Sequence, residues 1–420
     1  MDKQLTFGST NRILTNINVW SPDSQWIVYD VRPDAEGSVF EGSRIEAVNL
    51  DGEVKSLYQS SHGAHCGVAT WHPREDKVVF ILGPENPTPD WQYGPAHRQG
   101  MIVDARTKQN TNLDARDLTA CTSGALRGGS HVHVWHPQGD WVSFTYDDHL
   151  CPDKGRNIGV AVPHPVRVPL AERNHDGEYF SVLVTRTNPQ PRPGSDEIKR
   201  AFEESWIGEN GYLRPNGTRQ KRALAFQGEV RTEDRETISE VFVVDLPDDL
   251  TQPTADSPLQ GTLTTPPNPP FGTMQRRLTF TAKRKFPGIQ GPRHWLRSSP
   301  DGAHIAFLMR DNNGIVQLWT ISPNGGAPNQ MTRDKRSIQS AFSWSRDGQF
   351  IAYAADNSIF IVEAATGNSH RLTTRFADAN APLPLAIVWS PDGKHIAYQR
   401  RVTQKDGTRS NQIFMVESST

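Results

Sequence analysis

The chain has 420 residues, of which 22% are charged and 35% are hydrophobic, and its formal net charge at pH 7 is -2. A net charge this close to zero, with no basic or acidic tail, argues against a protein that binds nucleic acid. No apolar run is long enough to span a membrane, and residues 1–10 lack the apolar segment of a signal peptide. We therefore expect neither nucleic acid nor a membrane among the partners.

The number and spacing of the cysteines indicate a cellular compartment. Cys66, Cys121 and Cys151 are odd in number and are not spaced as a zinc knuckle. Unpaired thiols are typical of a reducing environment. The sequence therefore predicts reduced cysteines and a cytoplasmic location.

One short phrase recurs along the chain. An apolar run ends in Trp, then come Ser or His, usually Pro, a turn with Asp or Gly, and a second apolar run. Each copy predicts two strands joined by a tight turn. The copies are NVWSPDSQWIVY (Trp20), ATWHPREDKVVFI (Trp71), HVWHPQGDWVSF (Trp135), LRSSPDGAHIAF (Ser298 in place of Trp), FSWSRDGQFIAY (Trp344) and IVWSPDGKHIAY (Trp389).

Two further strands follow several copies, and the last of them carries an Arg/Gln-Leu/Met-Thr signature, as at residues 371–373. Four antiparallel strands that repeat around an axis form a β-propeller. The interval from Trp135 to Ser298 is too long for one blade. Within it, residues 175–177 read as a degenerate turn, followed by a strand over 179–184. We therefore predict an all-β fold, a single domain over residues 1–420 with seven four-stranded blades.

The chain ends suggest how the ring closes. Residues 3–7 repeat the signature of a fourth strand without strands before them, whereas residues 412–416 form the third strand of a blade. The N-terminal strand is therefore expected to complete the last blade, which leaves no exposed sheet edge.

Blade four contains the largest departure from the repeat, an insertion over 188–221. A Pro-rich turn precedes Ser195, a suitable N-cap, and the apolar residues that follow are spaced as one face of a short helix. This helix is expected either to cap the blade rim or to form a lid over the channel. Loops are expected at 86–99 and at 250–272, the latter rich in Pro and Thr and placed on the outside.

Histidines recur at matching positions of the first strands. His131 lies four residues before Trp135, and His294 lies four residues before Ser298. His133 is expected on the same face as His131, because side chains alternate along a strand. Innermost strands line the channel, so these imidazoles converge on one mouth, where they can bind a divalent metal or act as a general base.

Other residues complete this candidate site. We assign catalytic roles to His133, Arg293 and His65. Substrate-binding roles are assigned to Arg127, Arg156, Trp206 and Trp295. In the alternative interpretation, the histidines only form hydrogen bonds to an adjacent blade. His72 and His136 stand in the turn itself, where other copies have Ser, and are expected to be structural.

The chain resembles known families. The SPDG turn followed by IAF or IAY, with a trailing LT strand, resembles the TolB-type propeller repeat over almost the whole chain. The segments GSDEIKRAFEESWIGENGY, RALAFQGEV and EVFVVDLP resemble the YidR family of unknown function. This resemblance implies the fold but no reaction.

The repeat is also distantly similar to oligogalacturonate lyases, which are seven-bladed propellers. This resemblance implies a manganese ion at a channel mouth, held by His and Gln, with another His that removes the C5 proton of a uronate. The residues that would correspond are His131, His294 and Gln339, but blade seven has no His at the start of its first strand.

Three functional hypotheses follow. The first is a site for an acidic sugar or a similar small anion at the channel mouth, where a metal-assisted, β-eliminating oligouronide lyase is one outcome. The second is a non-catalytic scaffold that binds a protein partner. The third is sugar binding without turnover.

Overall fold

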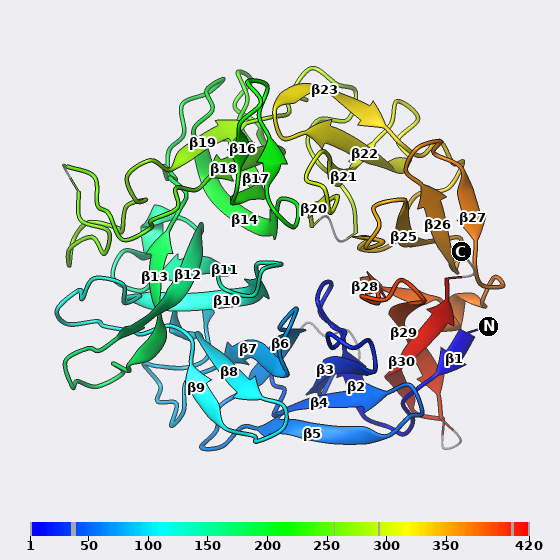
Figure 1. Cartoon of the computed structure of the whole chain (residues 1–420), viewed down its shortest axis with the longest axis horizontal. Helices are drawn as coiled ribbons and strands as arrows, with labels where there is room; N and C mark the ends of the chain where they lie inside the picture. Colours follow the sequence, from blue (N-terminus) through cyan, green and yellow to red (C-terminus); the bar gives the residue numbers. More distant parts are fainter. Residues whose placement is uncertain (1, 35–38, 256, 293–294, 405–406, 419–420) are drawn as a thin grey trace.

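The computed structural model describes residues 2–34, 39–255, 257–292, 295–404 and 407–418. Its strands form seven four-stranded antiparallel sheets, arranged radially around a common axis (Figure 1). The predicted seven-bladed β-propeller is therefore confirmed.

The first three blades follow each other along the chain, and their strands are named from the axis outward. Blade one contains β2 (Asn11–Ile13), β3 (Trp26–Arg32), β4 (Arg44–Asn49) and β5 (Val54–Gln59). Blade two contains β6 (Cys66–Trp71), β7 (Lys77–Leu82), β8 (Gln99–Asp104) and β9 (Asn110–Asn112). Blade three contains β10 (Gly128–Trp135), β11 (Val142–Asp148), β12 (Asn157–Val166) and β13 (Gly177–Leu183).

The next three blades keep the same order. Blade four contains β14 (Ile198–Trp206), β17 (Ala223–Arg231), β18 (Thr237–Asp245) and β19 (Met274–Arg277), with a separate hairpin of β15 (Tyr212–Leu213) and β16 (Arg219–Gln220). Blade five contains β20 (Arg297–Ser298), β21 (Ile305–Arg310), β22 (Val316–Ser322) and β23 (Gly325–Gln330). Blade six contains β24 (Ser343–Trp344), β25 (Phe350–Ala355), β26 (Ser358–Glu363) and β27 (Ser369–Arg371).

The N-terminal strand closes the ring, as predicted. Blade seven contains β28 (Pro382–Trp389), β29 (His395–Thr403), β30 (Arg409–Glu417) and β1 (Asp2–Gln4). Strand β1 pairs with β30 in antiparallel register, with Asp2 opposite Val416. The pairing joins both ends of the chain in one sheet (Figure 1).

Helices are nearly absent from the described residues. They are three short 3-10 turns, at Pro95–His97, Pro152–Lys154 and Asp378–Asn380. None of the helices in these residues has the length and the hydropathy needed to cross a membrane.

The expected helix in blade four is wrong. The segment Ile198–Trp206 is strand β14, the innermost strand of that blade. Two β-bulges shift its register, one between Ile198 and Ala201 and one between Phe202 and Ser205. Each bulge adds a residue to the alternation, so the apolar residues are spaced as on a helix.

The boundary between blades three and four is also corrected. Residues 177–183 form β13, the outermost strand of blade three, and not the start of blade four. Trp206, at the end of β14, occupies the position of Trp20 and Trp135 in their blades, and the repeat therefore has a seventh copy. The 250–272 segment connects β18 to β19 at the outer side (Figure 1) and buries Leu250 and Leu259.

The turns of the repeat have a structural role. In blade one, the Ser21 hydroxyl donates to Asp23 at 2.5 Å and accepts the Trp26 N–H at 2.9 Å. In blade two, His72 replaces this serine, and its Nδ1 accepts the backbone N–H groups of Arg74 and Glu75 at 3.0 and 2.8 Å. His72 is therefore a turn residue, as its position predicts.

Candidate functional site

A cavity of about 410 Å³ opens at the mouth where the innermost strands begin. We call it the His131 cavity. The residues that line it come mainly from blades one, two and three. They are Ile13, Leu14, Thr15, Asn16, Asp30, Arg32, Phe40, Val68, Tyr93, Arg98, His131, Val132, Trp295 and Leu385.

Two charged residues reach the cavity from the second strand of blade one. Strand β3 runs antiparallel to β2, so its last residues return to the mouth where β2 begins. Asp30 is fully buried, and its carboxylate meets Arg32 Nε at 2.6 Å and accepts the Val68 N–H at 3.1 Å. The carboxylate therefore orients Arg32 and anchors β6.

Aromatic rings and guanidinium groups form a stack beside this ion pair. Phe40, from the β3–β4 loop, lies parallel to Tyr93, from the β7–β8 loop, with ring centroids 4.6 Å apart and an interplanar angle of 8°. Arg32 lies over the Phe40 ring and Arg98 over the Tyr93 ring, each at 5.2 Å. Cation–π contacts of this kind hold guanidinium groups in place without neutralising them.

Polar nitrogen atoms at this cavity lack partners. Nε and Nη1 of Arg98 and Nδ1 of His131 are buried without a hydrogen-bond partner. Burial, reinforced by Arg98 and Arg156, holds the pKa of His131 well below its usual value. His131 is therefore neutral at pH 7 and lies in a positive electrostatic environment, which favours an anionic ligand.

The expected shared face of His131 and His133 is wrong. Val132 has φ 55°, and the register of β10 shifts between His131 and Val134. The alternation breaks at this bulge. His133 is fully buried, where its Nε2 lies 2.9 Å from the Ser130 hydroxyl, and it does not line the His131 cavity.

Three other predicted residues lie outside this cavity's lining. The His65 ring is 6.3 Å from the Tyr93 ring that does line it. Arg127 is buried, pairs with Asp148 at 2.9 Å and donates to the Thr262 carbonyl. Arg156 pairs with Asp147 at 3.0 Å.

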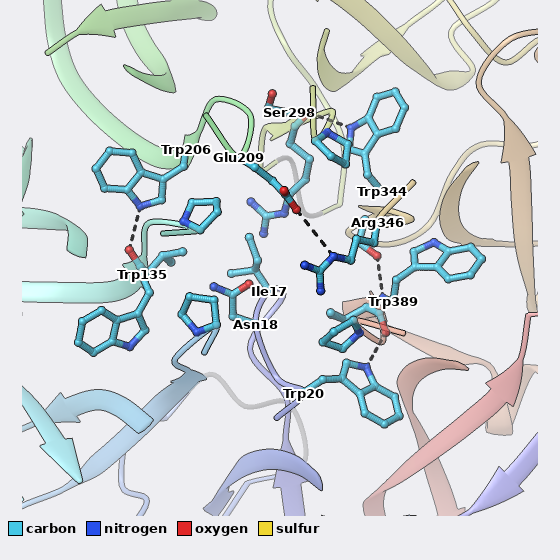
Figure 2. Close-up of a pocket in the computed structure, with 18 of the residues that line it drawn as sticks. Ile17, Asn18, Trp20, Trp135, Trp206, Glu209, Ser298, Trp344, Arg346 and Trp389 are labelled. Atoms are coloured by element: carbon cyan, nitrogen blue, oxygen red, sulfur yellow. Dashed lines mark hydrogen bonds and ion pairs between the residues drawn. The ribbon is translucent and has the colours of Figure 1, made fainter. Parts of the chain in front are cut away.

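The remaining predicted residues are divided between the two mouths. Trp295 lines the His131 cavity, whereas Trp206 lines a second cavity at the opposite mouth (Figure 2). Gln339 is exposed and lines neither. Arg293 and His294 lie outside the described residues.

The described residues do not fit a manganese site. Of the two expected ligands that the structure describes, His131 lines the cavity and Gln339 does not, and no group of three or more His, Cys, Asp or Glu in the described part of the chain is placed to hold a metal ion. Arg32 and Arg98 line the same cavity, and their positive charges oppose a divalent cation.

The repeat contains a signal for Asp30, which is not a histidine. Asp30 lies ten residues after Trp20, and the matching position carries an uncharged residue in five other blades. Those residues are Ile81, Thr145, Leu308, Ala354 and Gln399. A carboxylate at this position marks blade one as different. Phe40, Tyr93 and Arg98 come from loops outside the repeat, where no comparison between copies reveals them.

Comparisons with known proteins agree with this description. A family model described as a protein of unknown function, DUF3748, matches residues 65–179. An oligogalacturonate lyase in complex with manganese has a TM-score of 0.58 at 10% identity, over 99% of this chain and 92% of that chain. An oligogalacturonate lyase from Vibrio parahaemolyticus has a TM-score of 0.56 at 9% identity, over 99% and 93%. These two similarities establish the fold alone.

A relative with a similar sequence is the uncharacterized protein YidR of Escherichia coli (strain K12). It is 49% identical over 408 residues, which cover 94% of this chain and 94% of that protein. At this identity and coverage, the chain belongs to the YidR family.

Proposed function

We propose that the His131 cavity binds a small carboxylated sugar. The observation that carries this proposal is the set of unpartnered buried donors, Nε and Nη1 of Arg98, beside His131. A buried donor without an acceptor costs about 1–3 kcal/mol. A ligand carboxylate supplies the missing acceptors.

The charge and shape of the cavity support the same ligand class. Arg32 and Arg98 line it, and the carboxylate of Asp30 is already engaged by Arg32 and by the Val68 N–H. Phe40 and Tyr93 add aromatic surface, against which the C–H face of a pyranose packs. Two proteins with this fold are oligogalacturonate lyases, and oligogalacturonates are carboxylated sugars.

The same arrangement suits β-elimination. A guanidinium that pairs with the uronate carboxylate lowers the pKa of the C5 proton. His131, which is neutral, takes that proton, the electron pair forms the C4–C5 double bond, and the C4–O4 bond breaks. The leaving oxygen takes a proton from solvent water and departs as an alcohol, and the His131 imidazolium returns its proton to the solvent. In this proposal His131 is the base, in place of His133 and His65.

Binding is tested by calorimetry with digalacturonate and with a neutral galactose disaccharide. We expect binding of digalacturonate only, and a loss of about tenfold to a hundredfold in affinity for Arg98→Gln, because charged hydrogen bonds contribute about 1.5–3 kcal/mol. Arg336→Gln is the matched control, since Arg336 pairs with Asp356 and does not line the cavity. Equal affinity of Arg98→Gln and the unmodified protein would refute the proposal.

Turnover is tested separately. The absorbance of a 4,5-unsaturated uronide is followed with the protein as purified, after elemental analysis, and again with added manganese. A product that disappears in His131→Ala supports the lyase, whereas binding without product leaves sugar binding without turnover. If no uronide binds, the alternative of a scaffold for a protein partner gains support.

A further inference from the structure

The opposite mouth contains a second cavity, of about 310 Å³, where the innermost strands end (Figure 2). We call it the Trp206 cavity. Its walls are the recurring indoles and prolines of the repeat, with prolines from five blades. These prolines are Pro22, Pro73, Pro137, Pro300 and Pro391. Their rings provide flat apolar surface.

The repeat departs from its pattern at this cavity by adding charge. Arg297 stands one residue before the Trp position, where the other blades have Val, Thr or Ser. Arg346 replaces the turn proline in blade six. Across the mouth, Arg346 Nε lies 3.8 Å from the carboxylate of Glu209 (Figure 2). Arg74 also lines the cavity, so guanidinium groups outnumber carboxylates among the described residues of its lining.

Arg297 is a buried cation that faces this cavity. Its exposed fraction is 4%. Nη2 donates to the side chain of Asn16 at 2.6 Å and Nη1 donates to the Leu296 carbonyl at 2.7 Å, whereas Nε has no partner. None of the ion pairs in the described part of the chain includes Arg297. The positive charge is therefore hydrogen-bonded rather than ion-paired. Burial lowers the pKa of the guanidinium to about 10, against the opposing effect of the Glu204 and Glu203 carboxylates. Holding such a charge inside a protein is costly.

The same contact separates the two cavities. Asn16 lines the His131 cavity, and the next two residues, Ile17 and Asn18, line the Trp206 cavity. Arg297 is bonded to Asn16 across the axis, from blade five to blade one. The Trp206 cavity therefore has a cationic floor, apolar walls and its own mouth.

We propose that the Trp206 cavity is a second ligand site, for a small planar aromatic carboxylate. The carboxylate binds at Arg297, and the ring lies against the proline and indole side chains. A volume of about 310 Å³ is at the lower end of the range for small-molecule sites, which excludes a large ligand. This inference does not depend on the carboxylated-sugar site.

The test uses indole-3-acetate and its neutral amide, indole-3-acetamide, in ligand-detected NMR and calorimetry. We expect the acetate to bind at least about tenfold more tightly than the amide. Arg297→Gln is expected to remove this preference and Arg297→Lys to retain part of it. Arg346→Glu, at a side chain that is 64% exposed, tests the charge without a risk to folding and is expected to weaken binding severalfold. Arg336→Gln is the control.

The results separate this site from the His131 cavity. Saturating digalacturonate is expected to leave the affinity for indole-3-acetate unchanged, and displacement would overturn the proposal. Equal binding of acetate and amide, or unchanged binding in Arg346→Glu, would also overturn it. A failure of digalacturonate to bind would count against the sugar site alone.

Discussion

The indole N–H of Trp206 donates a hydrogen bond of 3.0 Å to the backbone carbonyl of Val134. The bond joins the innermost strands of blades three and four. Trp20 makes the matching bond to Val388, also at 3.0 Å, and so joins blades one and seven (Figure 2). In contrast, Nε1 of Trp135 is buried without a partner. Tryptophan at the repeat position therefore donates a hydrogen bond between blades at Trp206 and Trp20, and buries an N–H without a partner at Trp135.

Replacement of these indoles measures the value of the bond. Trp206→Phe is expected to lose about 1 kcal/mol more free energy of unfolding than Trp135→Phe, because it alone removes a hydrogen bond. Chemical denaturation of both variants measures the difference, and the loss of ring volume is common to both. Equal destabilisation would show that the bond contributes nothing.

Close packing between blades two and three leads to a second prediction. A Cβ atom at Gly100 would lie 2.7 Å from Asp114 Oδ1 and 2.8 Å from His133 Nε2. Gly100→Ala is therefore expected to cost about 1–3 kcal/mol of stability. Gly94→Ala is the matched control, since its nearest atom lies at 3.9 Å and its backbone is extended. A Gly100→Ala variant as stable as the control would contradict the packing described.

The pH dependence of stability is predicted to contain a contribution from Glu204. Burial raises the pKa of its carboxyl to about 7 from an ordinary value of 4.5. Between these pH values the native state binds more protons than the unfolded state, so stability falls as pH rises. The loss reaches up to about 3 kcal/mol. Glu204→Gln is expected to remove this slope in urea unfolding from pH 4.5 to 7.5.

Glu233→Gln is the control for that measurement, because Glu233 is an exposed carboxylate. Buried histidines such as His133, whose pKa burial lowers to about 3, add an opposite slope in both proteins. The difference between the unmodified protein and Glu204→Gln isolates the carboxyl. An identical slope in both would mean that Glu204 is ionised in the native state.

The cysteines are predicted to differ in reactivity. Cys66 is fully buried, and burial raises the pKa of its thiol to about 12. Cys121 and Cys151 are half-buried, so a reagent can reach their thiols without unfolding of the protein. Titration with a disulfide reagent is expected to modify two thiols in the native protein and the third only after denaturation. Reaction of Cys66 in the native state would contradict its burial.

The architecture was accessible from sequence because each turn repeats the same local chemistry. Ser, Pro, Asp and Gly specify the turn, and the flanking apolar runs specify the strands. The boundary of blade four was misplaced because β-bulges in β14 give a strand the apolar spacing of a helix. A β-bulge in β10, at Val132, likewise breaks the alternation of side chains, so His133 and His131 do not share a face.

The candidate site was only partly accessible. His131 was identified from its position four residues before Trp135, and Trp295 from its place beside His294, and both line the cavity. Arg98 and Tyr93 were missed because they lie in a long loop, whose path depends on contacts with another loop, through Phe40. Contacts between loops that are distant in the sequence produce no repeating pattern of residues.

Because β1 completes blade seven, the order of synthesis determines when the ring can close. The contact between Thr6 and Ile413 joins residues 407 positions apart. Strand β1 is made long before β30, so blade seven cannot form until β30 has been synthesised. Until then β1 is an unpaired strand, and the first and last blades each lack their neighbour across the seam. Premature termination near residue 409 would remove β30. The other six sheets would then lack the β1–β30 pairing that closes the ring.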